Sequence, residues 1–108
     1  MELSFANAAI EKLCSNEREM KRRYGNDGAR KLKTRLSELD AADRVGDLAA
    51  GNPHQLTGDL AGQYSLRLNG GNRLILAPVP PVPRAEDGSI AWAMVEHVMI
   101  MEIGDYHD

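Results

Sequence analysis

The chemistry open to this sequence depends on a few histidine and arginine residues in its second half. Arg67 and Arg73 flank a glycine-rich turn, His54 follows a proline in a polar segment, and the chain closes on Asp105, Tyr106, His107 and Asp108. An imidazole has an ordinary pKa of about 6.5, so it can take up or release a proton at neutral pH. A guanidinium can bind and neutralise phosphoryl oxygens in a transition state.

Cleavage of RNA is a reaction that uses this set of groups. RNA supplies its own nucleophile, because the 2′-hydroxyl attacks the adjacent phosphate when a base removes its proton and an acid protonates the leaving 5′ oxygen. No metal or other cofactor is required. A tyrosine such as Tyr106 can stack on a splayed base or orient the phosphate. The residues therefore suggest metal-independent chemistry at an RNA phosphate.

The same residues also have plain structural interpretations. His97 interrupts an apolar strand, where a satisfied or partly exposed histidine is the simpler account, and residues 105–108 would on composition alone be a frayed end. Metal binding through His54, Asp105 and His107 is an alternative, but their spacing fits no preformed ligand set, so we expect no metal. Without a glycine-rich phosphate loop, HExxH, CxxC or GxSxG, the sequence lacks the residues that define those nucleotide-binding, zinc and serine-hydrolase classes.

Charge is unevenly distributed along the chain. The 13 Lys and Arg residues against 16 Asp and Glu give a net charge of −3, which does not by itself indicate a nucleic-acid-binding protein. Residues 18–35, however, hold eight basic side chains against two carboxylates. This basic segment is either a contact surface for a polyanion or a solvated helix face.

The first half of the chain predicts a short strand and a helical hairpin. Leu3-Ser4-Phe5 alternates like a strand, and the apolar spacing that follows predicts a helix from Asn7, which continues through residues 17–23 to Tyr24-Gly25. A second helix is expected after Asn26-Asp27. Its apolar positions are Ala29, Leu32, Leu36 and Leu39, and its opposite face carries Arg30, Lys31, Lys33 and Arg35.

The second half of the chain predicts strands. Residues 63–69 and 73–77 are expected to pair through the turn at 69–72, whose asparagines and glycines tolerate positive φ. The prolines at 78–83 predict a stiff loop, and the apolar run at 95–103 predicts an interior strand covered over much of both faces. Helices followed by strands predict an α+β fold, in which an N-terminal helical hairpin packs on a small, mainly antiparallel sheet. We expect one domain, residues 1–108.

Two further features of the sequence indicate the cellular compartment in which the protein is found. The single Cys14 lies at helical spacing among apolar residues and is expected to fill the core in a reducing environment. No basic-then-apolar leader opens the chain, and its apolar stretches are far shorter than a membrane span. The sequence predicts a soluble, cytoplasmic protein that does not enter a membrane.

One ordered set of residues resembles the HigB branch of the RelE/ParE toxin superfamily. The resemblance runs over His54-x-Leu56-x-Gly58-Asp59-Leu60-x-Gly62-x-Tyr64-Ser65-Leu66-x-Leu68-Asn69-Gly70, then Asn72-Arg73-Leu74, then Asp105-Tyr106-His107. It covers most of residues 51–108 and implies a RelE-like fold. It also implies the toxin of a type II toxin–antitoxin pair that cleaves messenger RNA in the ribosomal decoding site, without a cofactor, and that is inhibited by a HigA-like helix-turn-helix antitoxin.

The resemblance also implies roles for individual residues and partners. The catalytic residues would be His54, Arg73, Asp105, Tyr106 and His107, and Arg67 would bind RNA from a basic strand position. Because the net charge is negative, we expect the basic segment to supply the contact with ribosomal RNA, through Arg22, Arg23, Lys31 and Lys33. Operator DNA would be reached only indirectly, through the antitoxin.

Three features depart from the family pattern and keep two alternatives open. Thr57 occupies a position that is commonly lysine, the proline-rich stretch at 78–83 enlarges a loop that is usually short, and the net charge of −3 is unusual for a protein that approaches ribosomal RNA. The first alternative is a ParE-like toxin that inhibits gyrase by binding, without cleavage. The second is an inactive relative that is kept as an antitoxin-binding partner.

Overall fold

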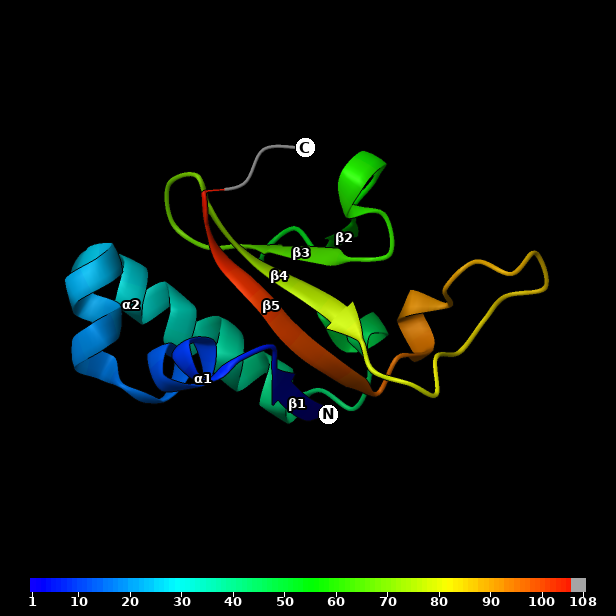
Figure 1. Cartoon of the computed structure of the whole chain (residues 1–108), viewed down its shortest axis with the longest axis horizontal. Coiled ribbons are helices and arrows are strands. Elements are labelled where there is room, and N and C mark those ends of the chain that lie inside the picture. Colours follow the sequence, from blue (N-terminus) through cyan, green and yellow to red (C-terminus); the bar gives the residue numbers. More distant parts are fainter. Residues whose placement is uncertain (106–108) are drawn as a thin grey trace.

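A five-stranded sheet forms the centre of the computed structural model, which describes residues 1–105. The strands are β1 (Glu2–Phe5), β2 (His54–Gln55), β3 (Tyr64–Arg67), β4 (Asn72–Pro78) and β5 (His97–Asp105). They lie in the order β1-β5-β4-β3-β2. β1 runs parallel to β5 and every other neighbouring pair is antiparallel (Figure 1). The predicted α+β architecture is confirmed.

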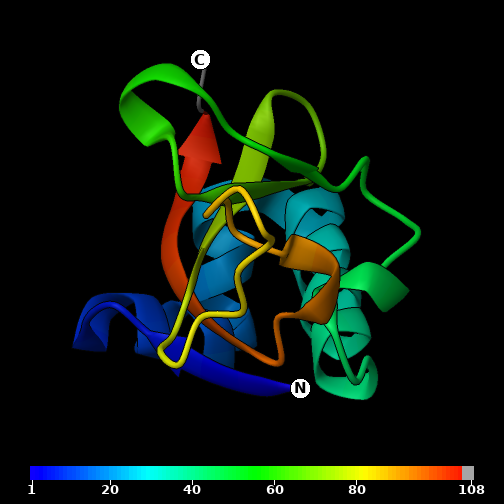
Figure 2. The ribbon, with the colours of Figure 1, turned by 90° about the vertical axis from the view of Figure 1, so that its right-hand side faces the viewer.

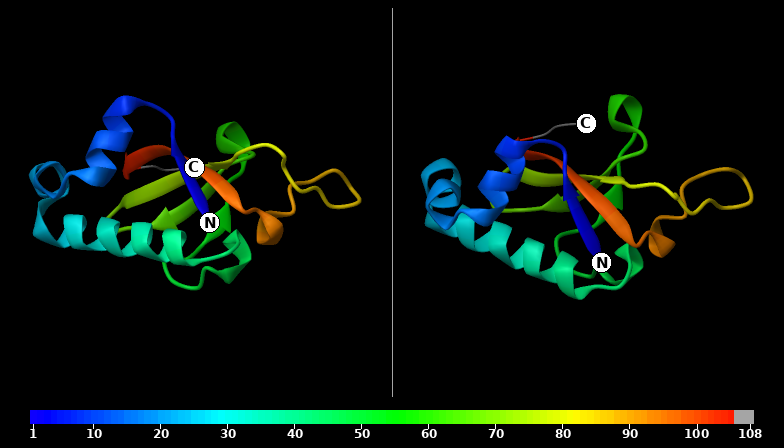
Figure 3. Two further views of the ribbon diagram at one scale, coloured as in Figure 1. Left: turned by 90° about the horizontal axis from the view of Figure 1, so that it is seen from below. Right: turned by 60° about the horizontal axis from the view of Figure 1, so that its bottom comes forward.

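The helices lie together on one face of this sheet (Figures 1 and 3). They are α1 (Ala8–Ser15) and α2 (Glu17–Ala41). The prediction that the first helix continues through residues 17–23 is wrong, because the Asn16 side chain accepts a hydrogen bond from the Glu19 N–H at 3.1 Å and thereby caps a new helix. Gly25, with φ of +74°, interrupts α2 at the position predicted to link two helices.

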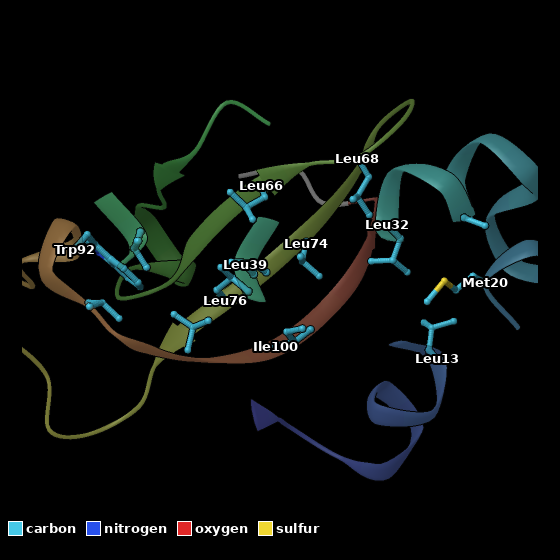
Figure 4. Packing of buried hydrophobic residues seen from close by; sticks show 14 residues of the cluster. Leu13, Met20, Leu32, Leu39, Leu66, Leu68, Leu74, Leu76, Trp92 and Ile100 are labelled. Carbon is cyan, nitrogen blue, oxygen red and sulfur yellow. The ribbon is translucent and has the colours of Figure 1, made fainter. Parts of the chain in front are cut away.

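The main core fills the space between the helices and the sheet (Figure 4). Ala29, Leu32 and Leu39 are buried on α2 as their spacing predicted, and Leu36 is half-buried against them. They pack with buried leucines and isoleucine of the strands, namely Leu66, Leu68, Leu74, Leu76 and Ile100. Cys14 lies at the edge of this cluster, and burial raises the pKa of its thiol to about 11.

Within residues 1–105, neither α1 nor α2 covers the opposite face of the sheet (Figure 1). Leu56 and Ile75 are buried but lie outside the main core cluster, and the segment after β2, with a turn of 3-10 helix at Gly58–Leu60, passes above this face (Figure 1). Further along β5, Met99 and Met101 are half-buried, and Glu102 is exposed. The predicted cover over both faces of the last strand is therefore only partial. We refer to this side of the sheet as the open face.

The proline-rich stretch begins an arm that projects from the end of the sheet (Figure 1) and is seen end-on in Figure 2. It is more regular than the predicted loop, because Arg84 and Ile90 form an antiparallel bridge and the Ala85 N–H donates to the Ser89 carbonyl at 2.8 Å. The arm returns through a 3-10 helix, Trp92–Met94, where the Trp92 ring packs 4.7 Å from that of Tyr64. A second 3-10 helix spans Val45–Asp47. Within residues 1–105, no helical segment has the length and hydropathy that crossing a membrane requires.

Candidate functional site

Two arginines face each other on the open face of the sheet. The turn at 69–72, where Gly70 has φ of +58°, pairs β3 with β4 so that Arg67 lies directly opposite Arg73. Arg73 is half-buried and its Nη1 lies 3.5 Å from the Ser65 Oγ, whereas Arg67 is exposed. Among the ion pairs formed within residues 1–105, none includes either arginine. Because facing like charges repel, this pair is suited to hold an anion between its guanidiniums.

A buried arginine on α2 holds the backbone beneath this pair. The Arg35 Nε donates to the Arg67 carbonyl at 2.9 Å, and its Nη1 lies 2.7 Å from the Glu38 carboxylate. Gly51 packs on the guanidinium, and a Cβ there would lie 2.6 Å from the Arg35 Nε. The prediction that Arg35 belongs to the solvated basic face is wrong. It lies three residues after Leu32 and four before Leu39, which is the spacing of the apolar face.

His54 lies on the same face as the arginines. It pairs with Ser65 across β2 and β3, and direct cross-strand partners share a face of the sheet. The His54 Nδ1 lies 2.8 Å from the Asn52 carbonyl, which can only accept, so Nδ1 carries the proton. The lone pair is then on Nε2, as a general base requires. His54, Ser65, Arg67 and Arg73 form a set that we call the arginine site.

The end of β5 adds one predicted residue on the other side of the sheet. Gly104 is the partner of Arg73 and Asp105 that of Asn72, so alternation along β5 places Asp105 on the face opposite Arg73. The Asp105 carboxylate instead approaches the turn, since a Cβ on Gly71 would lie 2.7 Å from its Oδ1. Tyr106 and His107, predicted as catalytic residues, lie outside the described residues.

Sequence reasoning missed two residues of the open face. Glu102 is exposed and is the partner of Ile75, which places its carboxylate on the same face as Arg73. Its signal in the sequence is a charge within an otherwise apolar strand. Ser65 is fully buried, and its cross-strand partners are His54 on β2 and Ile75 on β4. Its hydroxyl accepts a hydrogen bond from Arg73. From the sequence, the alternation of apolar and polar residues along β3 predicted only the face of the sheet on which Ser65 lies.

The basic segment forms exposed ion pairs along α2. Glu17 accepts from Lys33 at 2.9 Å and lies 3.3 Å from Lys21, and these bonds hold the pKa of its carboxyl below the ordinary value. Arg22 similarly pairs with Glu19 at 2.7 Å. Exposed pairs of this kind contribute little to stability, so a polyanion can displace the carboxylates. The predicted RNA-contacting residues are all exposed, namely Arg22, Arg23, Lys31, Lys33 and Arg67.

His97 lies apart from the arginine site and joins β1 to β5. Its Nε2 lies 2.6 Å from the Ser4 Oγ, and its Nδ1 lies 3.5 Å from the Glu2 carboxylate. The residue is partly exposed and hydrogen-bonded, as predicted. Nowhere in residues 1–105 do three or more metal-ligating side chains cluster closely enough to hold an ion.

Comparison with known proteins finds similarity of fold. No protein-family model matches the sequence, and no curated protein is similar to it. A YoeB/ParE toxin from Agrobacterium tumefaciens superposes with a TM-score of 0.60 and 15% identity, over 99% of this chain and 100% of that one. A YoeB-YefM complex from Staphylococcus aureus gives 0.58 and 19%, over 100% and 98%. A YoeB dimer from the same organism gives 0.56 and 20%, also over 100% and 98%. The chain therefore has the fold of YoeB/ParE toxins.

Proposed function

We propose that this chain is a RelE/ParE-type toxin of a type II toxin–antitoxin pair and that it cleaves messenger RNA on the ribosome without a metal. The observation that carries the proposal is the arginine site, where two facing guanidiniums share with an imidazole the face of a YoeB/ParE-like sheet that α1 and α2 leave free. The exposed Arg67 makes this part of the face accessible to an extended polynucleotide. The guanidiniums match the charge and shape of a phosphodiester.

In this reaction the 2′-hydroxyl is the nucleophile and water is not consumed. The His54 Nε2 takes the 2′-hydroxyl proton, the 2′ oxygen bonds to phosphorus, and the bond from phosphorus to the 5′ oxygen breaks. The leaving oxygen takes a proton from an acid, for which His107 is the proposed donor. Arg73 and Arg67 bind the non-bridging oxygens, where negative charge builds up in the transition state. The products are a 2′,3′-cyclic phosphate and a 5′-hydroxyl.

The proposed partners follow from the charge of each surface and from the fold. Ribosomal RNA contacts the basic segment through Arg22, Arg23, Lys31 and Lys33, whose phosphate contacts release counterions. An antitoxin binds and inhibits the chain, by analogy with the Staphylococcus aureus toxin YoeB, which forms a complex with YefM. We propose a HigA-like helix-turn-helix antitoxin, which would also carry the pair to operator DNA. Tyr106 completes the proposed site at the end of the chain, whereas Asp105, on the face opposite Arg73, takes no proton-transfer role.

Induced expression with RNA mapping tests this function. We expect growth arrest and messenger RNA cleavage that depends on ribosomes, and we expect Arg73→Ala to reduce cleavage by roughly 10²–10³-fold, the loss measured for removal of one transition-state donor. Deletion of residues 105–108 should also relieve arrest. The matched control is Arg84→Ala on the projecting arm, which should leave arrest unchanged. Full toxicity in both the Arg73→Ala and deletion variants would contradict the site.

A ParE-like gyrase inhibitor is the second candidate function. The position of Asp105 on the face opposite Arg73 favours this function. Among the described residues, the arginine site then has two cations and one imidazole but no second group for acid–base catalysis, and such a site can bind without cleaving. In that case the purified chain would inhibit gyrase-catalysed supercoiling, and messenger RNA would stay intact after induction. An inert phenotype on expression would instead indicate an inactive antitoxin-binding relative, consistent with Thr57 in place of lysine.

A further inference from the structure

A groove lies where the projecting arm meets the first residues of β1 and β5. It encloses about 630 Å³, with residues 79–83 forming one wall and Met94, Glu96, His97 and Glu2 forming the other. The turn between Arg67 and Arg73 lies at one end of β4, and the segment after Pro78, which lines the groove, leaves from the other end (Figure 1). The groove is therefore separate from the surface proposed for RNA.

The walls of this groove are ordered by the fold. The Val79 N–H donates to the His97 carbonyl at 3.0 Å, and the Ala91 N–H donates to the Pro83 carbonyl at 2.9 Å, so both ends of the proline wall are tied to neighbouring segments. His97 is held in turn by Ser4 and Glu2. Because prolines have little backbone freedom to lose, binding against this wall costs little conformational entropy.

The groove combines an apolar interior with an acidic rim. Met94 is 47% exposed and is the large hydrophobic side chain that the fold leaves uncovered among residues 1–105. The Glu2 and Glu96 side chains are 81% and 67% exposed beside it. Glu96 lies 3.5 Å from Arg44, whose Nη1 also lies 3.5 Å from the Met94 Sδ, and an adjoining hollow adds Asp43 and Asp47. The four carboxylates outnumber the single arginine around this exposed apolar surface, which disfavours an anionic ligand and favours a cationic one.

We propose that this groove binds an extended, cationic segment of a partner protein, with an apolar side chain against Met94 and the proline wall and flanking Lys or Arg side chains at Glu2 and Glu96. On binding, Met94 contributes apolar surface that becomes buried, and the carboxylates select a partner segment of positive charge. The inference goes beyond the proposed nuclease function. It holds whether or not the chain cleaves RNA, because it uses none of the residues of the arginine site.

Fluorescence anisotropy with a labelled seven-residue peptide tests the groove. The probe is an acetylated and amidated peptide in which lysine alternates with leucine, and the matched probe has glutamate in place of lysine. We expect the lysine peptide to bind the full chain at least tenfold more tightly. Met94→Ala should weaken binding about tenfold through lost apolar contact. Glu96→Gln and Glu2→Gln should each weaken it about two- to threefold, as expected for exposed charge pairs.

Two controls separate the groove from general acidity and from self-association. Glu86→Gln removes a carboxylate from the arm outside the groove walls and should leave affinity unchanged, and amide shifts on titration should concentrate at residues 79–97. Equal binding of both peptides, no binding of the lysine peptide, or equal effects of Glu86→Gln and Glu96→Gln would overturn the proposal. So would sedimentation showing a dimer that Met94→Ala dissociates, since a second copy would then occupy the groove. Arg73→Ala should bind the peptide normally, whatever its effect on RNA.

Discussion

Removal of one facing guanidinium should stabilise the folded chain, and Arg67→Gln is the substitution that shows it. Arg67 and Arg73 are direct cross-strand partners, and like charges in that position destabilise an antiparallel pair by roughly 0.2–1 kcal/mol. The Arg67 side chain is exposed. Its backbone N–H donates to the Gly51 carbonyl and its carbonyl accepts from Arg35, so glutamine removes the charge and keeps both bonds.

The expected gain is about 0.5 kcal/mol at low ionic strength, the middle of that range, which raises the Tm of a domain of this size by roughly 2–4 °C. In 1 M NaCl the Debye length is about 3 Å, so the gain should disappear. Thermal unfolding followed by circular dichroism at low and high NaCl measures both quantities. Inorganic phosphate should raise the Tm of the wild-type chain more than that of the variant, because the variant has lost half of the anion site.

Arg18→Gln is the matched control, since Arg18 is exposed on α2 and is in none of the ion pairs within the described residues. Its Tm should stay unchanged at low salt. If Arg67→Gln lowers the Tm, or if its gain persists in 1 M NaCl, the two guanidiniums do not repel each other as their register requires. Phosphate stabilisation of equal size in both chains would refute the anion site.

Three further substitutions test the framework around the site. Arg35→Gln should lower the free energy of unfolding, measured in urea, by about 3 kcal/mol. The reason is that it removes a buried charge that binds the Arg67 carbonyl and the Glu38 carboxylate. A loss below about 1 kcal/mol would contradict the burial of the Arg35 charge. Tyr24→Phe removes the 2.9 Å hydrogen bond from the hydroxyl to the Ile103 carbonyl and should cost about 1 kcal/mol by the same measurement. The pKa of Cys14 is raised from 9.0 to about 11 on folding, so its contribution to stability is present below pH 9 and is lost as the pH rises toward 11. Cys14→Ala should flatten that part of the stability profile, and an unchanged slope would contradict the assignment.

The features that local pattern determines were predicted from the sequence. The spacing of Ala29, Leu32 and Leu39 gave the buried face of α2, because a helix presents the same face every three to four residues. The asparagine and glycine residues at 69–72 gave the hairpin, because a tight turn needs residues that tolerate positive φ. The pattern predicted the pairing of the strands but not their register, and it is the observed register, with Leu68 bonded to Asn72, that makes Arg67 and Arg73 cross-strand partners.

Features that depend on distant pairing were not predictable in the same way. β1 pairs with β5 across most of the chain, and His54 joins the sheet through only two residues, so neither partnership leaves a local signal. Arg35 was misassigned because its charge was given more weight than its position on the apolar face. Glu102 became a site candidate only when the register placed it beside the arginines.

The arrangement of charge along the molecule has a consequence for how it meets other macromolecules. The chain measures 44 Å in its longest dimension and 26 Å in the other two, with the basic segment and the arginine hairpin toward one end and the arm, with the acidic groove at its base, toward the other (Figure 1). A body with this separation has a permanent dipole, although its net charge is negative. The field of a polyanion turns such a body during diffusion, before any contact forms. Collisions with a polyanion would thus occur helix end first, leaving the arm directed outward.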